Sequence, residues 1–186
     1  SDILQAVGDD DFAVLVSNRE GEDCDDIVHP SLVQRLAHQG LRLLQDSSFD
    51  IAVFFQYQDA LADFPDFNIV MGTDELFIPA FEAGAKACAC TYGVVFPELV
   101  RRMCDDWCAG RRQDAWEIQK TIRKVGEIFH SALSLPAMHA LLRMRGINAG
   151  VPRAPFHEIP EASRVFIEAE LVRLRVLKRR KKSFLP

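Results

Sequence analysis

The fold is decided by the segment LRLLQDSSFDIAVFFQYQDALADFPDFNIVMGTDE, residues 41–75. It opens with an apolar run, 41–44, which predicts a strand. Positions 51, 54, 55, 58 and 61 then follow the three-to-four-residue spacing of a helix, predicted over 50–62. A second apolar run, 67–71, predicts the next strand, after which Gly72 turns the chain. A strand, a helix and a second strand in this order indicate a parallel pair with a right-handed crossover.

The same alternation extends in both directions from this segment. On the N-terminal side we expect a strand over 12–16, a polar loop, and a helix over 30–38 that ends before Gly40. On the C-terminal side we expect a helix over 74–84 and a strand over 86–91. Four such units fit half of an eight-fold β/α barrel. A small doubly wound fold is the alternative, but it expects helices on both faces of the sheet and does not explain the helical tail.

The strand patterns stop after Pro97. Helices are predicted over 97–109, 111–132, 134–145 and 160–182. We therefore expect an α/β fold with two domains: residues 1–109, half of a (β/α)8 barrel, and residues 110–186, a C-terminal helical extension.

The composition is that of a globular protein, with 48% hydrophobic and 26% charged residues. No apolar run approaches the roughly 18 residues of a membrane span, and no secretory or transit signal is visible. Five cysteines are too few and too irregular for a disulfide framework. We expect buried thiols in a reducing intracellular compartment, either the cytoplasm or the mitochondrial matrix. No cofactor and no metal site are expected.

Three motifs carry a resemblance to a known family. QDSSFD (45–50) resembles a K-D-S-S-G-D motif, GTDE (72–75) followed by Gly84-Ala85 resembles a G-x-D-E motif followed by G-A, and Arg145-Gly146 followed by PRAP (152–155) resembles a glycine preceding P-R-x-P. In this order they resemble the C-terminal portion of the dihydrodipicolinate synthase and N-acetylneuraminate lyase family, class I aldolases and lyases on a TIM barrel. The resemblance implies a partial TIM barrel, strands five to eight with their helices, plus a C-terminal helical region.

The catalytic positions that the resemblance implies are degenerate. Gln45 occupies the position of the lysine that forms a Schiff base with a 2-oxo acid, and an amide nitrogen is not a nucleophile at neutral pH. Ser17 occupies the position of the tyrosine that shuttles protons. Residues 1–75 hold 16 acidic and only three basic side chains, and the first lysine of the chain is Lys86. Lys86 begins a strand, at the barrel end opposite the active site.

Several substrate-side positions are retained, and the resemblance implies that they are remnants of a substrate site: Ser47, Gly72, Asp74, Glu75 and Thr91. A structural explanation competes with this one. Carboxylates in the first turn of a helix interact favourably with its dipole, and Asp46, Ser47 and Ser48 are suited to capping the following helix.

Basic residues without an acidic neighbour gather near the C-terminus: Arg173, Arg175, Lys178, Arg179, Arg180, Lys181 and Lys182. They predict either a solvated helix end or contact with RNA, an acidic lipid or an acidic protein surface. The open edges of a half barrel predict a covering partner, either other protein subunits or further segments of its own chain.

These observations lead to three functional hypotheses. The first is a catalytically inactive family member that serves as a structural or assembly subunit of a larger complex, with no small-molecule substrate expected. The second is an active carbon–carbon lyase or aldolase acting on a 2-oxo acid or sialic acid, whose N-terminal half is not in this chain. The third is a non-catalytic module that binds a 2-oxo acid or sugar acid.

Overall fold

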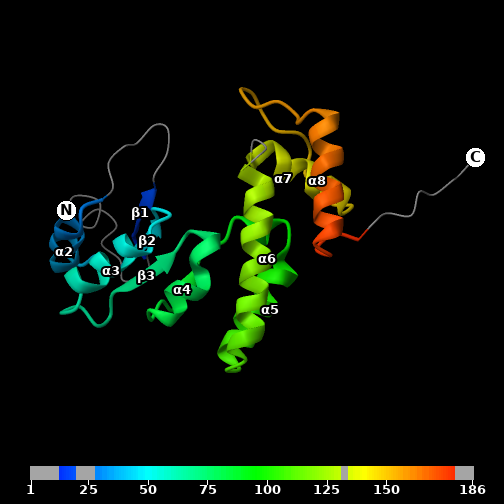
Figure 1. Cartoon of the computed structure of the whole chain (residues 1–186). Helices are drawn as coiled ribbons and strands as arrows, with labels where there is room; N and C mark the ends of the chain where they lie inside the picture. Colours follow the sequence, from blue (N-terminus) through cyan, green and yellow to red (C-terminus); the bar gives the residue numbers. More distant parts are fainter. Residues whose placement is uncertain (1–12, 20–27, 131–133, 179–186) are drawn as a thin grey trace, which may run out of the picture. The chain divides into compact units, whose positions relative to one another are not determined.

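The computed structural model describes residues 13–19, 28–130 and 134–178 (Figure 1). The chain divides into two compact units, residues 1–90 and 91–186, and each is described by itself. The sequence predicts a boundary at 109/110, between the expected half barrel and its helical extension. The division into compact units does not test that boundary, which stays a prediction.

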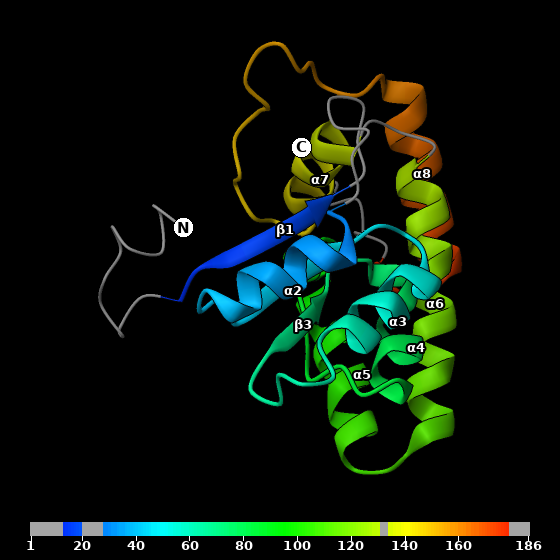
Figure 2. The same ribbon diagram turned by 90° about the vertical axis from the view of Figure 1, so that its left-hand side faces the viewer.

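The first unit is built around a parallel sheet of four strands in sequential order: β1 (Leu15–Arg19), β2 (Leu43–Ser47), β3 (Asn68–Met71) and β4 (Ala87–Cys88). They are connected by α2 (Pro30–His38), α3 (Ile51–Ala60), a 3-10 turn η1 (Asp74–Leu76) and α4 (Phe77–Glu82). Figure 2 shows this unit turned toward the viewer, with α2 and α3 beside the strands. The predicted parallel α/β sheet is confirmed.

The core of the first unit lies between one face of the sheet and the helices α2 and α3. Fully buried Leu44 of β2 packs there with Val33 and Ala37 of α2 and with Val53 and Tyr57 of α3. The alternating residues of the strands point to the other face. On that face Leu15 is 41% exposed, and Leu43 and Val70 are half-buried.

The strands begin later than predicted. β2 covers Leu43–Ser47 rather than 41–44, and the described part of β1 covers Leu15–Arg19 rather than 12–16. Polar residues such as Gln45 and Asp46 have low strand propensity, but parallel ladders on both sides of β2 pair their backbone groups. β4 is only two residues long, against a predicted strand over 86–91.

The predicted helix over 74–84 is interrupted. It is a 3-10 turn followed by α4, which begins at Phe77 and ends at Glu82. Pro79 explains the break, because a proline lacks the backbone N–H that an interior position needs. Starting the helix at Phe77 places Pro79 in the first turn, where that N–H has no partner to lose.

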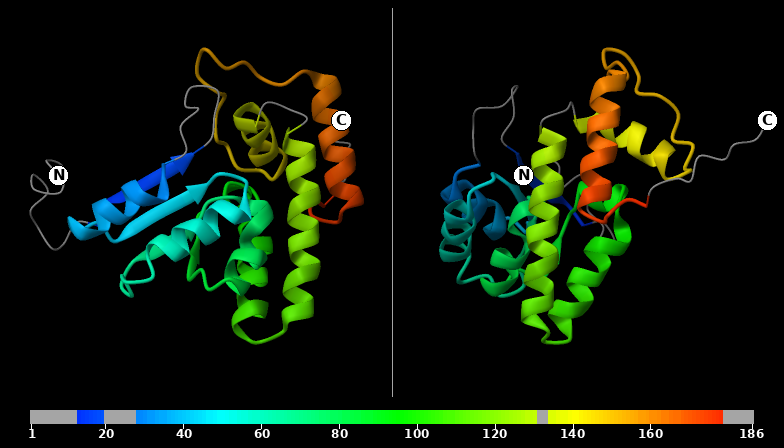
Figure 3. Two further views of the ribbon diagram at one scale, coloured as in Figure 1. Left: turned by 60° about the vertical axis from the view of Figure 1, so that its left-hand side comes forward. Right: turned by 45° about the vertical axis from the view of Figure 1, so that its right-hand side comes forward.

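The second unit is helical, with a short 3-10 turn η2 (Tyr92–Val94), α5 (Pro97–Cys108), α6 (Arg112–His130), α7 (Ser134–Met144) and α8 (Glu161–Arg173). α5 and α6 pack lengthwise as a hairpin, as the two views of Figure 3 show. The predicted helix over 160–182 is wrong in length, because α8 ends at Arg173. Arg175 adopts a left-handed φ of 60°, and Leu177 turns back to bury its side chain. Among the described helices, none is long and apolar enough to cross a membrane.

The location of the core makes a direct prediction. Replacing fully buried Leu44 with Ala leaves a cavity and is expected to cost about 2–5 kcal/mol of unfolding free energy. Leu15→Ala on the open face of the same sheet is the matched control, with an expected cost below about 1 kcal/mol. Urea denaturation followed by circular dichroism measures both. Equal losses would contradict the placement of the core.

Candidate functional site

The structure brings together Ser17 and Gln45, the two positions that the family resemblance implies are degenerate catalytic positions. Ser17 of β1 and Gln45 of β2 are register partners in the parallel ladder, so their side chains point to the same face of the sheet. This is the open face, opposite the core of α2 and α3. Ser17 is exposed there and Gln45 is half-buried. Each is the central residue of its five-residue strand.

Gly72, which directly follows β3, borders this site. Its backbone N–H donates to the Asp46 carbonyl over 2.6 Å, which draws the end of β3 against β2. A Cβ atom at position 72 would lie 2.0 Å from Ser47 Oγ and 2.9 Å from Gln45 Nε2. Gln45 Nε2 donates in turn to Ser47 Oγ over 3.2 Å. Three of the sequence-predicted residues, Gln45, Ser47 and Gly72, therefore form one contact cluster.

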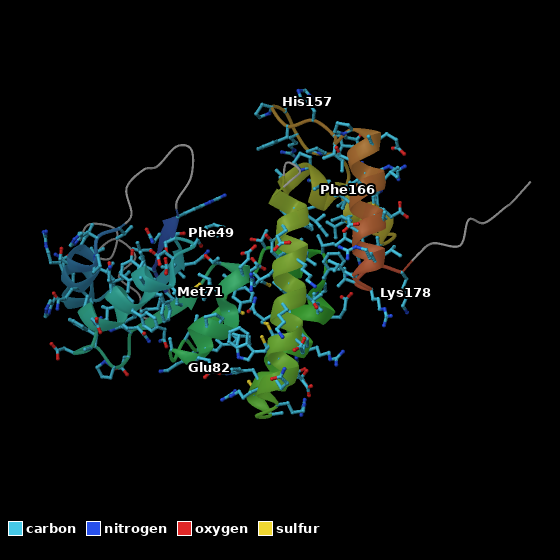
Figure 4. The ribbon with its side chains drawn as sticks, viewed as in Figure 1. Phe49, Met71, Glu82, His157, Phe166 and Lys178 are labelled. Atoms are coloured by element: carbon cyan, nitrogen blue, oxygen red, sulfur yellow. The ribbon has the colours of Figure 1, made fainter. Side chains whose placement is uncertain are left out.

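The turn after β3 carries a residue that sequence reasoning missed. Thr73 is 2% exposed, and its Oγ1 accepts a hydrogen bond of 3.3 Å from the backbone N–H of Phe49. Phe49 has a left-handed φ of 59°, at the position where the resembled motif has glycine, and its side chain is 55% exposed (Figure 4). A bulky residue in this conformation is unfavourable by roughly 1 kcal/mol. The signal for Thr73 was its place directly after Gly72.

The remaining predicted positions are Asp74, Glu75 and Thr91. Asp74 is buried and Glu75 half-buried, both in η1. Thr91 is exposed and opens the second unit. The prediction that Asp46, Ser47 or Ser48 caps the following helix is wrong. The N-cap of α3 is Asp50, whose carboxylate accepts a hydrogen bond from the Ala52 N–H over 2.8 Å.

Asp46 belongs to a buried polar network on the other face of the sheet, which the sequence did not reveal. It is 1% exposed, and its Oδ1 accepts hydrogen bonds from Asn18 Nδ2 (3.0 Å) and from the Ser48 N–H (3.1 Å). Asn18 Oδ1 accepts from the Val28 N–H, and Tyr57 donates its hydroxyl proton to the Val28 carbonyl over 2.6 Å. The network joins β1, β2 and α3 through Val28, which lies two residues before α2.

Burial of Tyr57 and the nearby charge of Asp46 together raise the pKa of the Tyr57 phenol to about 12. Both effects disfavour the phenolate, since burial removes its hydration and the carboxylate repels it. The phenol therefore stays protonated and keeps donating to Val28 throughout the physiological range.

The basic C-terminal residues have different surroundings. The Arg173 guanidinium pairs with Glu170 over 2.6 Å on the same helix. Arg175 and Lys178 are exposed after α8. Both line a groove of about 710 Å³ whose other basic side chains are Arg102 and Arg145. Residues 179–182 lie outside the described part of the chain. Among the described residues, no group of three His, Cys, Asp or Glu side chains is arranged to hold a metal ion.

Comparison with known proteins identifies the family. The model of the dihydrodipicolinate synthetase family matches residues 30–173, more than half of the chain, and this protein belongs to that family. An uncharacterised DapA-like lyase of Halobacterium salinarum is 28% identical over 134 residues, which cover 72% of this chain and 43% of the relative. The chain therefore spans less than half the length of this curated relative.

Solved structures show the same fold. Dihydrodipicolinate synthase DapA-2 of Bacillus anthracis superposes with a TM-score of 0.79 at 22% identity, over 91% of this chain and 56% of that one. N-acetylneuraminate lyase of Proteus mirabilis gives 0.68 at 17% identity, over 82% and 52%. Since the match covers little more than half of each neighbour, the predicted partial barrel with its helical region is confirmed.

The close packing at Gly72 predicts a strong effect of a single methyl group. Gly72→Ala is expected to destabilise the protein by about 1–3 kcal/mol, because the new Cβ overlaps the Ser47 hydroxyl and crowds the Asp46 carbonyl. Adding Ser47→Ala removes the closest contact, so the double variant is expected to recover part of the loss. A double-mutant cycle from urea denaturation measures the coupling. Simple additivity of the two changes would show that the contact is not made.

The Tyr57 environment predicts a pH dependence. The chain has two tyrosines, so a Tyr92→Phe variant reports Tyr57 alone by tyrosinate absorbance. The expected pKa is about 12 in the folded protein and about 10 in urea. Because the folded pKa is the higher one, the stabilisation is complete below pH 10 and is lost as the pH rises toward 12. Adding Asp46→Asn is expected to lower the folded pKa, and an unchanged value would refute the electrostatic contribution of Asp46.

Proposed function

We propose that this chain is a catalytically inactive member of the dihydrodipicolinate synthetase family that serves as a structural or assembly subunit of a larger complex. The observation that carries the proposal is the pairing of Ser17 with Gln45 in one register row. These are the positions at which the family resemblance implies the proton-shuttling tyrosine and the Schiff-base lysine. Both functional groups are replaced in the same place.

The chemistry of these side chains supports inactivity. A carboxamide nitrogen is delocalised into its carbonyl and does not add to a ketone, and a serine hydroxyl is a much weaker acid than a phenol, whose pKa is about 10. The Gln45 amide is also engaged with Ser47. Gln45 therefore supplies no neutral amine to attack the ketone, and Ser17 supplies no phenol to transfer protons.

Lys86, the only lysine in the sequence of the first unit, does not take the place of the lysine implied at position 45. Lys86 directly precedes Ala87, which lies in the same register row as Gln45 and Val70, so the Lys86 side chain points to the opposite face of the sheet. Lys86 lines a separate cavity of about 170 Å³ together with Phe54 and Asn68, the first residue of β3. Its side chain therefore lies on the other side of the sheet from Gln45.

The assembly role is supported by the surface that the sheet leaves open. Within the described part of the chain, β1 and β4 each pair along one edge only, and exposed strand edges are usually covered in stable proteins. The face that carries Ser17 and Gln45 also presents Leu15, which is 41% exposed. In closed eight-stranded barrels the equivalent face is packed with side chains from all strands. We expect other protein subunits to cover this face and these edges.

Schiff-base trapping tests the inactivity. The protein is incubated with pyruvate and sodium borohydride, and its intact mass is measured. No covalent adduct is expected, since Gln45 is not a nucleophile and the side chain of Lys86 lies on the other side of the sheet. An adduct on Lys86 or on any other residue of the first unit, mapped by peptide mass spectrometry, would refute the proposal and restore the hypothesis of an active lyase.

Calorimetry separates the structural role from ligand binding without turnover. Titration of the protein with pyruvate and with N-acetylneuraminate is expected to give no binding heat. Saturable heat that is lost on Gly72→Ala would support the non-catalytic binding module, since Gly72 shapes the cluster with Ser47. The matched control is Leu15→Ala, which lies on the same open face but makes none of the close contacts around Gly72.

A further inference from the structure

The second unit contains a groove with apolar walls. Its volume of about 710 Å³ lies within the range of roughly 300–1,000 Å³ that is typical of small-molecule sites. The N-terminal half of α5, the C-terminal end of α7 and the segment after α8 form it. Its apolar side chains are Phe96, Leu99, Met144, Val176 and Leu177. An apolar body that enters the groove is therefore removed from water, which favours its binding.

Basic side chains outnumber acidic ones in this groove. Among the described residues that line it, the acidic one is Glu98 and the basic ones are Arg102, Arg145, Arg175 and Lys178. Glu98 pairs with Arg145 over 2.9 Å, so these two charges offset each other. Figure 4 labels Lys178, just beyond the C-terminal end of α8. Three basic side chains are left to attract an anion.

These three cations have no carboxylate of their own in the described part of the chain. Arg102 lies 3.6 Å from Asp106, but that carboxylate already accepts hydrogen bonds of 2.8 and 2.6 Å from Arg111. One negative charge thus serves two guanidinium groups, and the Arg102 side chain stays 73% exposed. Arg175 and Lys178 are exposed and form no ion pair with a described residue. The groove therefore carries an excess of positive charge.

Arg175 occupies a backbone position that usually holds glycine. α8 ends in two hydrogen bonds, from the Val176 N–H to the Leu171 carbonyl (3.1 Å) and from the Arg175 N–H to the Val172 carbonyl (3.0 Å). Helices that end in this way most often have glycine where Arg175 stands, because the φ there is left-handed, here 60°. Packing does not explain the arginine, since its side chain is exposed. Glycine would relieve the strain but would remove one cation from the groove.

We propose that this groove binds an amphiphilic anion, a small molecule in which an apolar body ends in a carboxylate or phosphate group. The apolar body lies against the walls, and the anionic group meets Arg102, Arg175 and Lys178. Arginine suits both kinds of group, because its planar guanidinium donates paired, charge-assisted hydrogen bonds to them. The inference concerns the second unit alone, so it does not depend on whether the first unit is catalytically inactive.

Other anionic partners fit this groove less well. Single-stranded nucleic acids stack their bases on accessible aromatic faces. The aromatic residue that lines the groove is Phe96, which is 1% exposed and has the Arg145 guanidinium 5.5 Å from its ring centre. The next residues of the sequence, 179–182, are all basic, so charge disfavours this stretch of the same chain as the occupant.

Calorimetric titration of the whole chain tests the ligand class. Octanoate, decanoate and dodecanoate are expected to bind saturably, with affinity rising up to about fourfold for each CH₂ group that is buried. Decyl phosphate forms a second arm, which distinguishes a phosphate from a carboxylate ligand. 1-Octanol, which lacks the charge, is expected to bind at least tenfold more weakly than octanoate. Pyruvate and octaglutamate, which lack an apolar body, are expected to give no saturable heat.

Three outcomes of these titrations would overturn the proposal. They are no saturable binding of either amphiphile, equal binding of octanol and octanoate, and binding of an eight-nucleotide uridylate RNA as tight as that of decanoate. The last outcome would indicate a nucleic-acid site instead.

Substitutions at position 175 locate the site and separate its charge from its backbone strain. Arg175→Gly is expected to raise Tm by about 2–4 °C, because it relieves the left-handed strain, and to weaken decanoate binding about tenfold. Arg175→Lys keeps the charge and is expected to bind within about threefold of the wild type. The matched control is Arg123→Ala, which removes an exposed arginine of α6 outside the groove. Wild-type affinity in Arg175→Gly, or equal weakening by Arg123→Ala, would show that the groove is not the binding site.

Discussion

The buried carboxylate of Asp46 is the interaction on which the first unit depends. A charged group that is 1% exposed needs hydrogen bonds, because its loss of hydration is otherwise too costly. Asn18 and the Ser48 backbone supply them, and Asn18 and Tyr57 then hold the two polar groups of the Val28 backbone. One carboxylate thus ties β1 to β2, and the associated bonds tie the segment before α2 to α3.

This network also orders the open face. Asn18 and Asp46 are register partners, so their hydrogen bond fixes the pairing of β1 with β2, and a slip by one residue would turn every side chain to the other face. With the register fixed, Ser17 must lie beside Gln45. These are the two positions at which the family resemblance implies the proton-shuttling tyrosine and the Schiff-base lysine.

Several sequence-based expectations failed for identifiable reasons. The pattern of apolar residues predicted a strand over 41–44, but β2 extends through Gln45, Asp46 and Ser47, because neighbouring strands satisfy their backbone groups. The helix predicted through residue 182 ends at Arg173 without a glycine, because burial of Leu177 reverses the chain and Arg175 takes the left-handed conformation that glycine usually supplies. In both cases tertiary packing overrode local preference.

The sequence by itself determined the order of strands and helices, the α/β class and the family, because apolar periodicity and short motifs are local properties of the chain. It also determined that no lysine precedes Lys86 and that Gln45 stands where the family resemblance implies the Schiff-base lysine. Only the tertiary structure decided which side chains meet. The Gly72 contact with Ser47, the Asp46 network and the groove of the second unit depend on register and burial, which arise only when segments distant in sequence pack together.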